Sequence, residues 1–315
     1  MAEPVLISIC IPAFKHPDFL KRLLDSISIQ SFSNFEVILS DDSPDQEVER
    51  LAALYTAKFT LKYFHNKVPE GTPGNWNRAI QLAEGTWIKL MHDDDWFSDK
   101  DSLLQFVKGI ELNPGSGFIF SAYKNIYLDS GASMEVFISQ FRLRWLKQDP
   151  VTLFAQNGIG PPSTVMHKAN SAISYDTEMR WLVDIDLYIR LISNGNPAYI
   201  ASPLVNIGIS EKQVTRNSYR QRSVEIPESF RILNKTGPRH LRNILIYDAW
   251  WRLMRNLNIK SEADLTQSGY KGAVPSVIIS MIIWQKNISP KFLRIGLFSK
   301  STMCLHYLLH RHQVN

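Results

Sequence analysis

The chain has 315 residues, enough for one large domain with an appendage or for two domains. With 44% hydrophobic and 21% charged residues it has the composition of a globular protein, which excludes a disordered chain. A net charge of +5 is too small to indicate nucleic-acid binding, and no basic patch interleaved with aromatic residues stands out. We therefore expect no nucleic-acid partner.

The cysteines and the N-terminus bear on the cellular compartment. Cys10 and Cys304 lie near opposite ends of the chain and make no disulfide framework, as is usual in a reducing compartment. The opening residues MAEPVLISIC lack the basic and apolar regions of a signal peptide. The longest apolar window, residues 274–284, is shorter than the roughly 20 residues that span a bilayer. These features predict a cytoplasmic protein.

Strand-like and helix-like patterns alternate through the first part of the chain. Near-continuous apolar runs predict buried strands, and apolar residues at three- and four-residue spacing predict helices. In chain order we expect a strand at residues 5–11, a helix at 19–27, a strand at 35–40, a helix at 46–58, a strand at 61–64, a helix at 75–83, and strands at 87–91 and 118–123. This alternation predicts an α/β fold with a mostly parallel central sheet flanked by helices.

The pattern changes twice further along the chain. Residues 131–163 are irregular and include the turn-rich sequence NGIGPPST, after which a helix is predicted at residues 180–195. From about residue 236 the sequence becomes more helical and more basic. The sequence therefore predicts an α/β domain at residues 1–235 and a helical, basic section at residues 236–315.

Three loops that follow predicted strands carry the most informative side chains. PAF (12–14) follows the first strand, and the acidic loops DDS (41–43) and HDDD (92–95) follow two others. Ligands of parallel sheets collect at the carboxyl ends of the strands, and clustered carboxylates there suit Mg²⁺ or Mn²⁺ bridging to substrate phosphates. The alternative is a solvated acidic loop that caps the next helix near Asp99.

Other motifs for phosphate binding or nucleophilic catalysis are absent from the sequence. Neither G-x-G-x-x-G after the first strand nor G-x-x-x-x-G-K-[ST] occurs, which argues against a dinucleotide-binding or ATPase site. The two cysteines lack the spacing of a zinc site, and the G-x-S-x-G elbow is missing. A metal–phosphate site is therefore the best-supported chemistry.

Four segments follow one another between about residues 5 and 215: ISICIPAFKHPDFLKRLLDSISIQSFSNFEVILSDDS, NWNRAIQLAEGTWIKLMHDDDWF, GPPSTVM and WLVDIDLYIRL. Together they resemble the inverting glycosyltransferases of family 2, which have the GT-A fold. The resemblance implies a metal-dependent enzyme that moves a sugar from a nucleotide-diphospho-sugar, with a uridine nucleotide favoured, to a hydroxyl of a glycan or lipid-linked acceptor. It further implies a role in assembling bacterial surface polysaccharide.

The same resemblance assigns residues to the donor nucleotide. The nucleobase pocket would be lined by Pro12, Ala13 and Phe14, and Asp42 would accept a hydrogen bond from the base. Its neighbour Asp41 is a weaker candidate for that contact. Asn77 and Arg78 match a helix that covers the nucleotide, with Arg78 reaching toward a phosphate.

HDDD stands where the family has its Asp-x-Asp motif, so the resemblance implies a metal centre there. Asp94 would bind the Mn²⁺ or Mg²⁺ that bridges the donor diphosphate, Asp95 is the second-choice ligand, and Asp93 would face the ribose. His92 replaces the commoner first Asp, which leaves open whether it is a ligand. Trp96 would stack on a sugar, or else pack as an ordinary core tryptophan.

Asp184, in LVDIDLYIRL, matches the catalytic base of the family's Glu-Asp motif, although Val183 replaces the Glu. An inverting transfer needs a carboxylate to take the proton of the attacking acceptor hydroxyl. Asp186 lies two residues on, so on a helix it points well away from Asp184 and only one of them would be the base. The alternative is that both aspartates decorate the exposed side of an amphipathic helix.

Two further loops resemble the acceptor-side parts of the family. GIGPPSTVM matches an acceptor-side loop, although its glycines and prolines also suit ordinary turns. SEKQVTRN matches a C-terminal loop that often carries a histidine near the diphosphate. Ser210 stands at that position here, and Gln213 and Arg216 remain as candidates.

The last 50 residues contain no acidic residue, since Asp264 is the last one in the chain. An apolar segment flanked by Lys and Arg is typical of an interfacial helix at an anionic membrane. Such a helix would place the enzyme at the inner face of the plasma membrane. The alternative is that these helices pack on the α/β domain or on a second subunit.

Two other functions compete with sugar transfer. A nucleotidyltransferase would use a similar sheet, but it usually needs a Gly-rich basic loop where this chain reads PAFKHPD. A non-catalytic sugar-nucleotide-binding or scaffold subunit would not need to keep Asp42, Asp94 and Asp184 together. The sequence therefore favours the glycosyltransferase.

Overall fold

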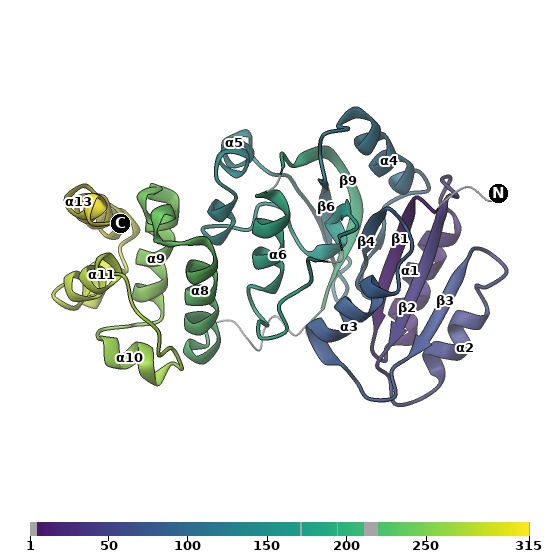
Figure 1. Ribbon diagram of the computed structural model, residues 1–315, viewed down its shortest axis with the longest axis horizontal. Coiled ribbons are helices and arrows are strands. Elements are labelled where there is room, and N and C mark those ends of the chain that lie inside the picture. The colour runs from purple at the N-terminus through teal and green to yellow at the C-terminus, as the bar shows by residue number, and fades with distance from the viewer. Residues whose placement is uncertain (1–4, 171, 194, 211–219, 315) are drawn as a thin grey trace. The chain divides into compact units, whose positions relative to one another are not determined.

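The computed structural model describes residues 5–170, 172–193, 195–210 and 220–314. These residues form two compact units, which are coloured along the chain in Figure 1. The first unit comprises residues 1–147, 158–178 and 186–213, and the second comprises residues 148–157, 179–185 and 214–315. The predicted boundary between two domains at residue 235 stays a prediction. The second compact unit also includes two short segments from earlier in the chain.

The first half of the central sheet has the parallel arrangement that the sequence predicts. Its strands are β1 (Ile7–Ala13), β2 (Phe35–Asp41), β3 (Leu61–His65) and β4 (Trp87–Leu90), in the spatial order β3-β2-β1-β4. All neighbouring pairs among them are parallel. The connecting helices are α1 (Pro17–Ser28), α2 (Glu47–Ala53) and α3 (Gly71–Gln81). The carboxyl ends of β1, β2 and β4 therefore lie next to one another, as expected for a binding edge.

The second half of the sheet is mixed. The order continues from β4 through β8 (Val165–Lys168), β6 (Phe118–Tyr127) and β9 (Ala198–Ile209) to β5 (Trp96–Phe97), with β7 (Ser133–Val136) on β6. The β4–β8, β8–β6, β6–β7 and β9–β5 pairs are antiparallel, and β6–β9 is parallel. Helix α4 (Ser102–Leu112) packs against β9 and β6. The predicted α/β class with flanking helices is confirmed. Of the strands that pair antiparallel, β7 lies in the segment whose sequence is irregular and β8 directly follows it.

The alternation of side chains in β1 explains how the sheet is covered. Ile7, Ile9 and Ile11 are fully buried in a core that includes the apolar face of α1. On the opposite face, the Cys10 thiol points at the Ala79 carbonyl oxygen of α3, at 3.6 Å. Burying each large aliphatic side chain contributes about 1.5–3 kcal/mol. Both faces of the parallel half are thus packed, and only its carboxyl edge is left for ligands.

Two predicted helices are shorter in the structure. The helix expected at residues 46–58 ends at Ala53, after which Leu54, Tyr55 and Lys58 donate to carbonyl oxygens three residues back, as in tight turns. The helix expected at residues 180–195 is α6 (Val183–Ile192). Residues 180–182 precede this helix, and their N–H groups donate to the Glu228 carboxylate.

The second unit is helical. Its helices are α8 (Arg222–Thr236), α9 (Ile244–Asn256), α10 (Glu262–Gln267), α11 (Ser276–Lys286), α12 (Pro290–Leu293) and α13 (Gly296–His310). Helix α5 (Gln140–Gln148) precedes it, and short 3₁₀ helices occur at Pro150–Phe154, Pro162–Thr164, Pro238–Arg242 and Arg311–Gln313. None of the helices described is both long and apolar enough to cross a membrane.

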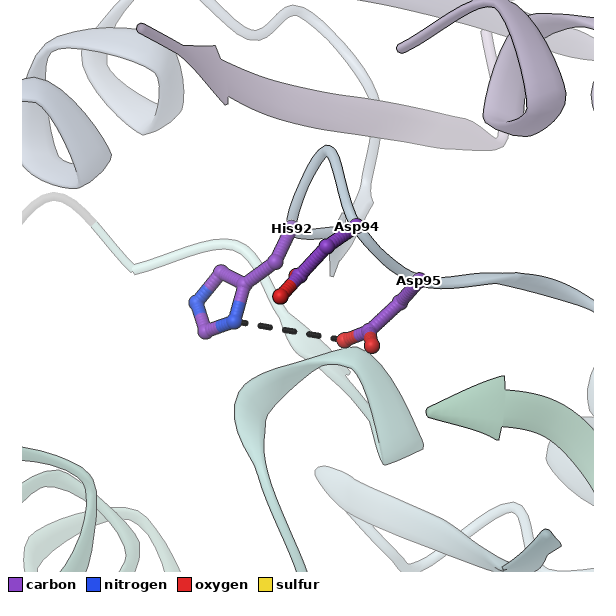
Figure 2. A group of neighbouring side chains, drawn as sticks. All are labelled: His92, Asp94 and Asp95. Carbon is purple, nitrogen blue, oxygen red and sulfur yellow. Dashed lines mark ion pairs between the residues drawn. The ribbon is translucent and has the colours of Figure 1, made fainter. Parts of the chain in front are cut away.

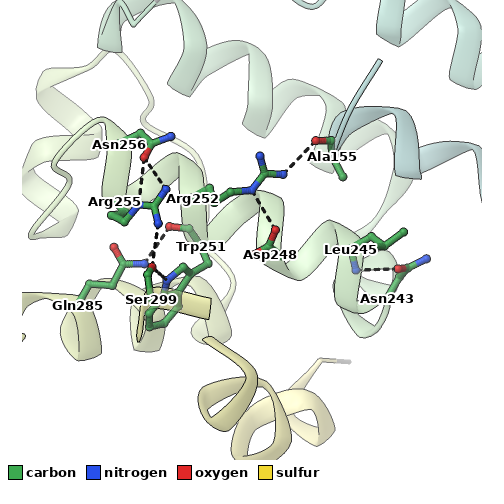
Figure 3. Close-up of polar contacts among 10 residues, drawn as sticks. All are labelled: Ala155, Asn243, Leu245, Asp248, Trp251, Arg252, Arg255, Asn256, Gln285 and Ser299. Carbon is green, nitrogen blue, oxygen red and sulfur yellow. Dashed lines mark hydrogen bonds and ion pairs between the residues drawn. The ribbon is translucent and has the colours of Figure 1, made fainter. Parts of the chain in front are cut away.

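Helix α9 organises this unit through polar contacts (Figure 3). The Trp251 indole N–H donates to Ser299 on α13 at 3.2 Å, and Gln285 on α11 donates to the Trp251 carbonyl oxygen at 2.9 Å. Arg252 donates to the Ala155 carbonyl oxygen at 3.0 Å. With Trp250 and Trp251 almost fully buried, α9 serves as the central helix of the unit.

Candidate active site

The loops after β1 and β2 are joined by backbone hydrogen bonds. The Asp42 N–H donates to the Ala13 carbonyl oxygen at 3.0 Å, and the Lys15 N–H donates to the Ser43 hydroxyl at 2.7 Å. Pro12 and Ala13 are buried strand residues, whereas the Phe14 side chain is 50% exposed. Of the three predicted pocket residues, Phe14 therefore offers the ring surface on which a base could stack.

The carboxylate of Asp42 is already in use within the chain. It is 3% exposed, and its two oxygens accept hydrogen bonds from the Asn66 amide at 2.8 Å and from the Glu70 and Gly71 N–H groups at 3.1 and 2.8 Å. Asp42 thus fixes the turn that leads into α3. Among the hydrogen bonds described, the Asp42 Oδ2 atom accepts only the one from the Gly71 N–H. Oδ2 is therefore the oxygen that would accept a hydrogen bond from the nucleobase, and this contact stays a prediction.

Asn77 is 9% exposed and makes a pair of hydrogen bonds with the Tyr175 backbone. Its amide donates to the Tyr175 carbonyl oxygen at 2.9 Å and its oxygen accepts the Tyr175 N–H at 2.8 Å. Asn77 therefore anchors the loop that contains Tyr175, and its contact with the nucleotide stays a prediction. The neighbouring Arg78 is partly buried on α3.

Asp93 links the acidic loop to the nucleobase edge. Its carboxylate accepts a hydrogen bond from the Phe14 N–H. Burial, together with the charge of Asp94, raises the pKa of Asp93 to about 7. The residue predicted to face the ribose is thereby held next to the residue predicted to face the base.

His92, Asp94 and Asp95 form a compact group of possible metal ligands (Figure 2). One ligand atom from each lies within 4.8 Å of the others, and His92 Nδ1 is 3.9 Å from an Asp95 oxygen. Burial and the charge of Asp94 raise the pKa of Asp95 well above its usual range, and burial lowers the pKa of His92. His92 Nε2 is buried and has no hydrogen-bond partner among the described residues.

These features fit a divalent cation. A neutral imidazole and two carboxylates are suitable ligands for such an ion, and its positive charge would relieve the repulsion between the two carboxylates. The geometry therefore places His92 with Asp94 and Asp95 in the candidate metal group, a possibility that the sequence left open. Asp93, in contrast, is turned to Phe14.

Ser163 and Lys89 support the group of His92, Asp94 and Asp95 through hydrogen bonds. The Ser163 hydroxyl accepts the His92 N–H at 2.9 Å and donates to the Asp95 carboxylate. The fully buried Lys89 donates to the Ser163 carbonyl oxygen, and burial lowers the pKa of Lys89 to about 7. The turn-rich GPPST segment is thus bonded directly to the acidic loop.

Arg22 and Gly208 hold the backbone of the same loop. The Arg22 guanidinium donates to the Asp94 carbonyl oxygen at 2.8 Å and lies 3.7 Å from the centre of the Trp96 ring. A Cβ on Gly208 would collide with that carbonyl oxygen, and the Gly208 N–H donates to Asp95 at 3.1 Å. One face of Trp96 is therefore covered by Arg22, which favours the packing role for Trp96 over stacking on a sugar.

Asp184 is the second residue of α6 and belongs to the second unit. Its carboxylate accepts the Ile185 N–H at 2.8 Å and the Asn157 amide at 3.2 Å. Burial raises the pKa of Asp184 to about 6, and the nearby charge of Glu228 adds to this effect. A carboxyl with that pKa is well suited to take up a proton near neutral pH.

Asp186 has a different environment. It is 3% exposed, and an Arg190 nitrogen lies 2.7 Å from its carboxylate. The alternative in which both aspartates decorate the exposed side of the helix is therefore wrong for Asp186. Its carboxylate is bound by the Arg190 guanidinium one turn along, whereas the partners described for Asp184 are an N–H group and an amide.

Comparison with known proteins decides the family. A model of glycosyl transferase family 2 matches residues 8–159, the segment that carries both acidic loops. Curated relatives with glycosyltransferase names align well beyond it. WcaA of Escherichia coli, named for colanic acid biosynthesis, is 28% identical over 225 residues, covering 68% of this chain and 77% of WcaA. Residues 8–159 therefore belong to glycosyltransferase family 2.

Further relatives agree with this family. AmsB of Erwinia amylovora, named an amylovoran biosynthesis glycosyltransferase, is 28% identical over 264 residues, which are 79% of this chain and 83% of AmsB. The match to family 2 and these names confirm that the chain is a glycosyltransferase, which favours this function over the nucleotidyltransferase and scaffold interpretations.

Solved structures confirm the GT-A fold of this family 2 chain. Staphylococcus aureus TarS has a TM-score of 0.57 at 17% identity, covering 98% of this chain and 54% of the TarS chain. TarS 1–349 in complex with UDP-GlcNAc gives 0.56 at 16% identity, over 98% and 92% of the two chains. The Pyrobaculum calidifontis mannosyltransferase PcManGT, in complex with GDP-Man and Mn²⁺, gives 0.53 at 16% identity, over 99% and 86%.

Sequence reasoning missed three residues around the acidic loop in the first unit, Arg22, Lys89 and Ser163, and it missed Glu228, which lies near Asp184 in the second unit. Lys89 alone carries a signal, because a lysine inside the apolar run WIKLM must find buried acceptors. Ser210 lies after β9 and is partly buried. Gln213 and Arg216, the other candidates in that loop, lie outside the described residues.

Replacing Ser163 by Ala is expected to weaken Mn²⁺ binding by about 10- to 100-fold, the usual effect of losing a group that orients metal ligands. The substitution removes the hydrogen bonds to His92 and Asp95 together. Calorimetric titration of Mn²⁺ measures the effect. Ser121→Ala is the matched control, because the Ser121 hydroxyl is buried in the same unit without a hydrogen-bond partner among the described residues. Equal Mn²⁺ affinity in the two variants would contradict the role of Ser163.

Proposed function

We propose that this family 2 glycosyltransferase is a metal-dependent, inverting enzyme. It would move a sugar from a nucleotide-diphospho-sugar to a hydroxyl group of a glycan or lipid-linked acceptor. The observation that carries the proposal is the group of His92, Asp94 and Asp95 beside Asp93, which is itself bonded to the Phe14 backbone. Metal-binding and base-facing side chains thus occur on one sheet edge, as a nucleoside diphosphate requires.

His92, Asp94 and Asp95 would hold the cation. An imidazole ligand suits a transition metal better than it suits Mg²⁺, so Mn²⁺ is the expected ion. A cation there supplies positive charge to the departing diphosphate. Arg22 and Ser163 keep the loop in shape, through the Asp94 carbonyl oxygen and the Asp95 carboxylate. The neighbour complexes with UDP-GlcNAc and with GDP-Man and Mn²⁺ support this choice of donor class.

Asp184 would act as the catalytic base. In the transfer, the acceptor oxygen forms a bond to the anomeric carbon while the bond from that carbon to the diphosphate oxygen breaks. The bonding electrons leave with the diphosphate, and the acceptor proton moves to the Asp184 carboxylate. A single in-line displacement inverts the anomeric carbon. NMR of the product from an α-linked donor should therefore show a β-linked sugar, and an α-linked product would contradict this mechanism.

The rate of transfer is expected to depend on pH through Asp184. This carboxyl must be ionised to accept a proton, and its pKa is raised to about 6. Below that pH kcat should fall about tenfold per pH unit, and above it kcat should be level, because the base form is then fully populated. Nucleotide release at saturating donor and Mn²⁺ from pH 4.5 to 8.5 measures this. A rate that is constant from pH 5 to 8 would contradict the assignment.

The acceptor is proposed from the relatives. WcaA and AmsB are named for the biosynthesis of colanic acid and amylovoran, two bacterial polysaccharides. We infer a growing surface polysaccharide as acceptor for this chain and a uridine nucleotide in the donor. With a lipid-linked acceptor at the inner face of the plasma membrane, which we also propose, the enzyme would work close to that surface.

A surface on α12 and α13 suits that location. Residues 291–300 (KFLRIGLFSK) expose Phe292, Ile295, Leu297 and Phe298 by 41–81%, alongside exposed Lys291, Arg294 and Lys300. The Phe292 and Phe298 rings are 5.6 Å apart, so the exposed side chains are neighbours. No acidic residue follows Asp264. Apolar side chains among basic ones bind an anionic bilayer by insertion and by charge.

The protein is therefore expected to float with vesicles that contain phosphatidylglycerol and not with vesicles of phosphatidylcholine alone. The double variant Phe292→Ser, Phe298→Ser should lose most of this binding. Leu112→Ser is the control, because Leu112 is 81% exposed but lies on α4 in the first unit. Equal flotation of the double variant and the control, or no flotation of the unaltered protein, would remove the membrane-docking role.

A further inference from the structure

Glu228, on α8, makes an unusual set of contacts within the second unit. The side chain is 5% exposed, and among the described residues it accepts hydrogen bonds from three consecutive backbone N–H groups. One carboxylate oxygen accepts the Arg180 N–H at 2.8 Å, and the other accepts those of Trp181 and Leu182 at 2.9 and 2.8 Å. These residues immediately precede Val183, the first residue of α6.

We propose that Glu228 is a positioning residue for the catalytic carboxylate of Asp184, because it fixes the turn from which α6 begins. The inference rests on the proposed role of Asp184 as base. Asp184 is only two residues beyond the last N–H that Glu228 binds. The N–H groups before a helix have no partner in the helical ladder, and a single buried carboxylate satisfies three of them here. The position of the helix start, and of Asp184 with it, then depends on α8.

The contact has a second consequence, which is electrostatic. Glu228 is the charged residue whose field raises the pKa of Asp184, in addition to burial. Asn157 faces the Asp184 carboxylate as an uncharged amide donor, and Asp186 on the same helix is paired with Arg190. Glu225, one turn earlier on α8, accepts the Arg220 N–H instead. Removing the charge of Glu228 should therefore lower the pKa of Asp184 and make it a weaker base.

Thermal unfolding tests this coupling without any substrate. Four proteins are compared at pH 5 and pH 8: the unaltered chain, Asp184→Asn, Glu228→Gln and the double variant. In the unaltered background, the gain in Tm from Asp184→Asn should be larger at pH 8, where both carboxylates are charged and repel each other, than at pH 5. In the Glu228→Gln background this pH-dependent gain should be smaller by the part that the Glu228 charge contributes, while the part that burial of Asp184 contributes remains. The same pH dependence in both backgrounds would overturn the electrostatic part.

Activity tests the positioning part, with UDP-GlcNAc and Mn²⁺ as the probe and UDP release as the readout. Glu228→Gln should move the acid limb of the kcat profile to lower pH and lower the plateau by about tenfold, with KM for the donor unchanged. Glu225→Gln is the matched control on the same helix and should leave the limb in place. A merely structural role would reduce the folded fraction and scale the rate equally at every pH.

Glu228→Asp separates position from charge and also serves if Glu228→Gln does not fold. It keeps the negative charge but shortens the side chain by one methylene, so the plateau should fall while the acid limb stays. An unchanged plateau would overturn the inference.

The assignment of Asp184 as the base can fail separately from this inference. If Asp184→Asn keeps full activity, the proposed function is wrong whatever effect the Glu228 variants have. If Asp184→Asn is inactive while Glu228→Gln behaves like Glu225→Gln, only this inference is wrong.

Discussion

Asp184→Asn is expected to lower kcat by about 10²- to 10⁴-fold, the usual contribution of a general base. Asparagine has nearly the shape of aspartate and can still accept the Ile185 N–H, which Asp184 accepts at 2.8 Å. What it cannot do is take the proton of the acceptor hydroxyl. The donor does not need that proton transfer in order to bind, so KM for the donor should change little.

Asp186→Asn is the control for Asp184→Asn. This change makes the same chemical substitution two residues away on α6, where the carboxylate is paired with Arg190 at 2.7 Å. Breaking a buried pair destabilises the fold, so Tm should fall, while kcat per folded molecule should stay near that of the unaltered protein. A kcat for Asp184→Asn within threefold of the unaltered value, or an equal loss in Asp186→Asn, would remove Asp184 as the base.

Asp94→Ala is expected to lower kcat/KM for the donor by at least about 100-fold, which corresponds to the several kcal/mol that a metal ion contributes to stabilising a departing diphosphate. Asp94 is the member of the candidate metal group whose charge raises the pKa of both Asp93 and Asp95. Without it, one ligand is lost and the attraction for a cation falls. The activity that remains should respond only weakly to added Mn²⁺.

Asp99→Ala is the matched control for this loss. It removes a negative charge from the same stretch of chain, but Asp99 is exposed and its carboxylate accepts the Asp101 N–H, outside the candidate metal group. Activity and its Mn²⁺ dependence should be unchanged in this variant. If Asp99→Ala and Asp94→Ala lose activity equally, the effect is one of general charge and not of metal binding.

Local sequence patterns were sufficient for the parts of the fold that depend on neighbouring residues. The order of β1 to β4 and the acidic loops after β2 and β4 follow from apolar runs that end at polar residues. The antiparallel strands β7 and β8 were not predicted, because they lie in or next to the irregular segment. Helix ends were predicted only approximately; before α6, for example, three N–H groups bind the distant Glu228 carboxylate, which no local pattern marks.

The candidate site was predicted in part for the same reason. His92, Asp94 and Asp95 are adjacent in the sequence, so their grouping follows from one loop. Ser163 acts on a residue 71 positions away and Glu228 on residues 46 to 48 positions away. No periodicity or motif marks such pairs. The hydrogen bonds of Asn77 to Tyr175, 98 positions away, are another contact that no motif marks.

Calorimetric titration of UDP and of GDP into the unaltered protein, with and without Mn²⁺, tests the central claim most directly. The account predicts that one nucleotide, with UDP favoured, binds with clear heat in the presence of Mn²⁺ and at least about tenfold more weakly without it. The candidate metal group of His92, Asp94 and Asp95 next to Asp93 would then be the donor site. No binding of either nucleotide by the folded protein, or equal binding with and without Mn²⁺, would contradict it.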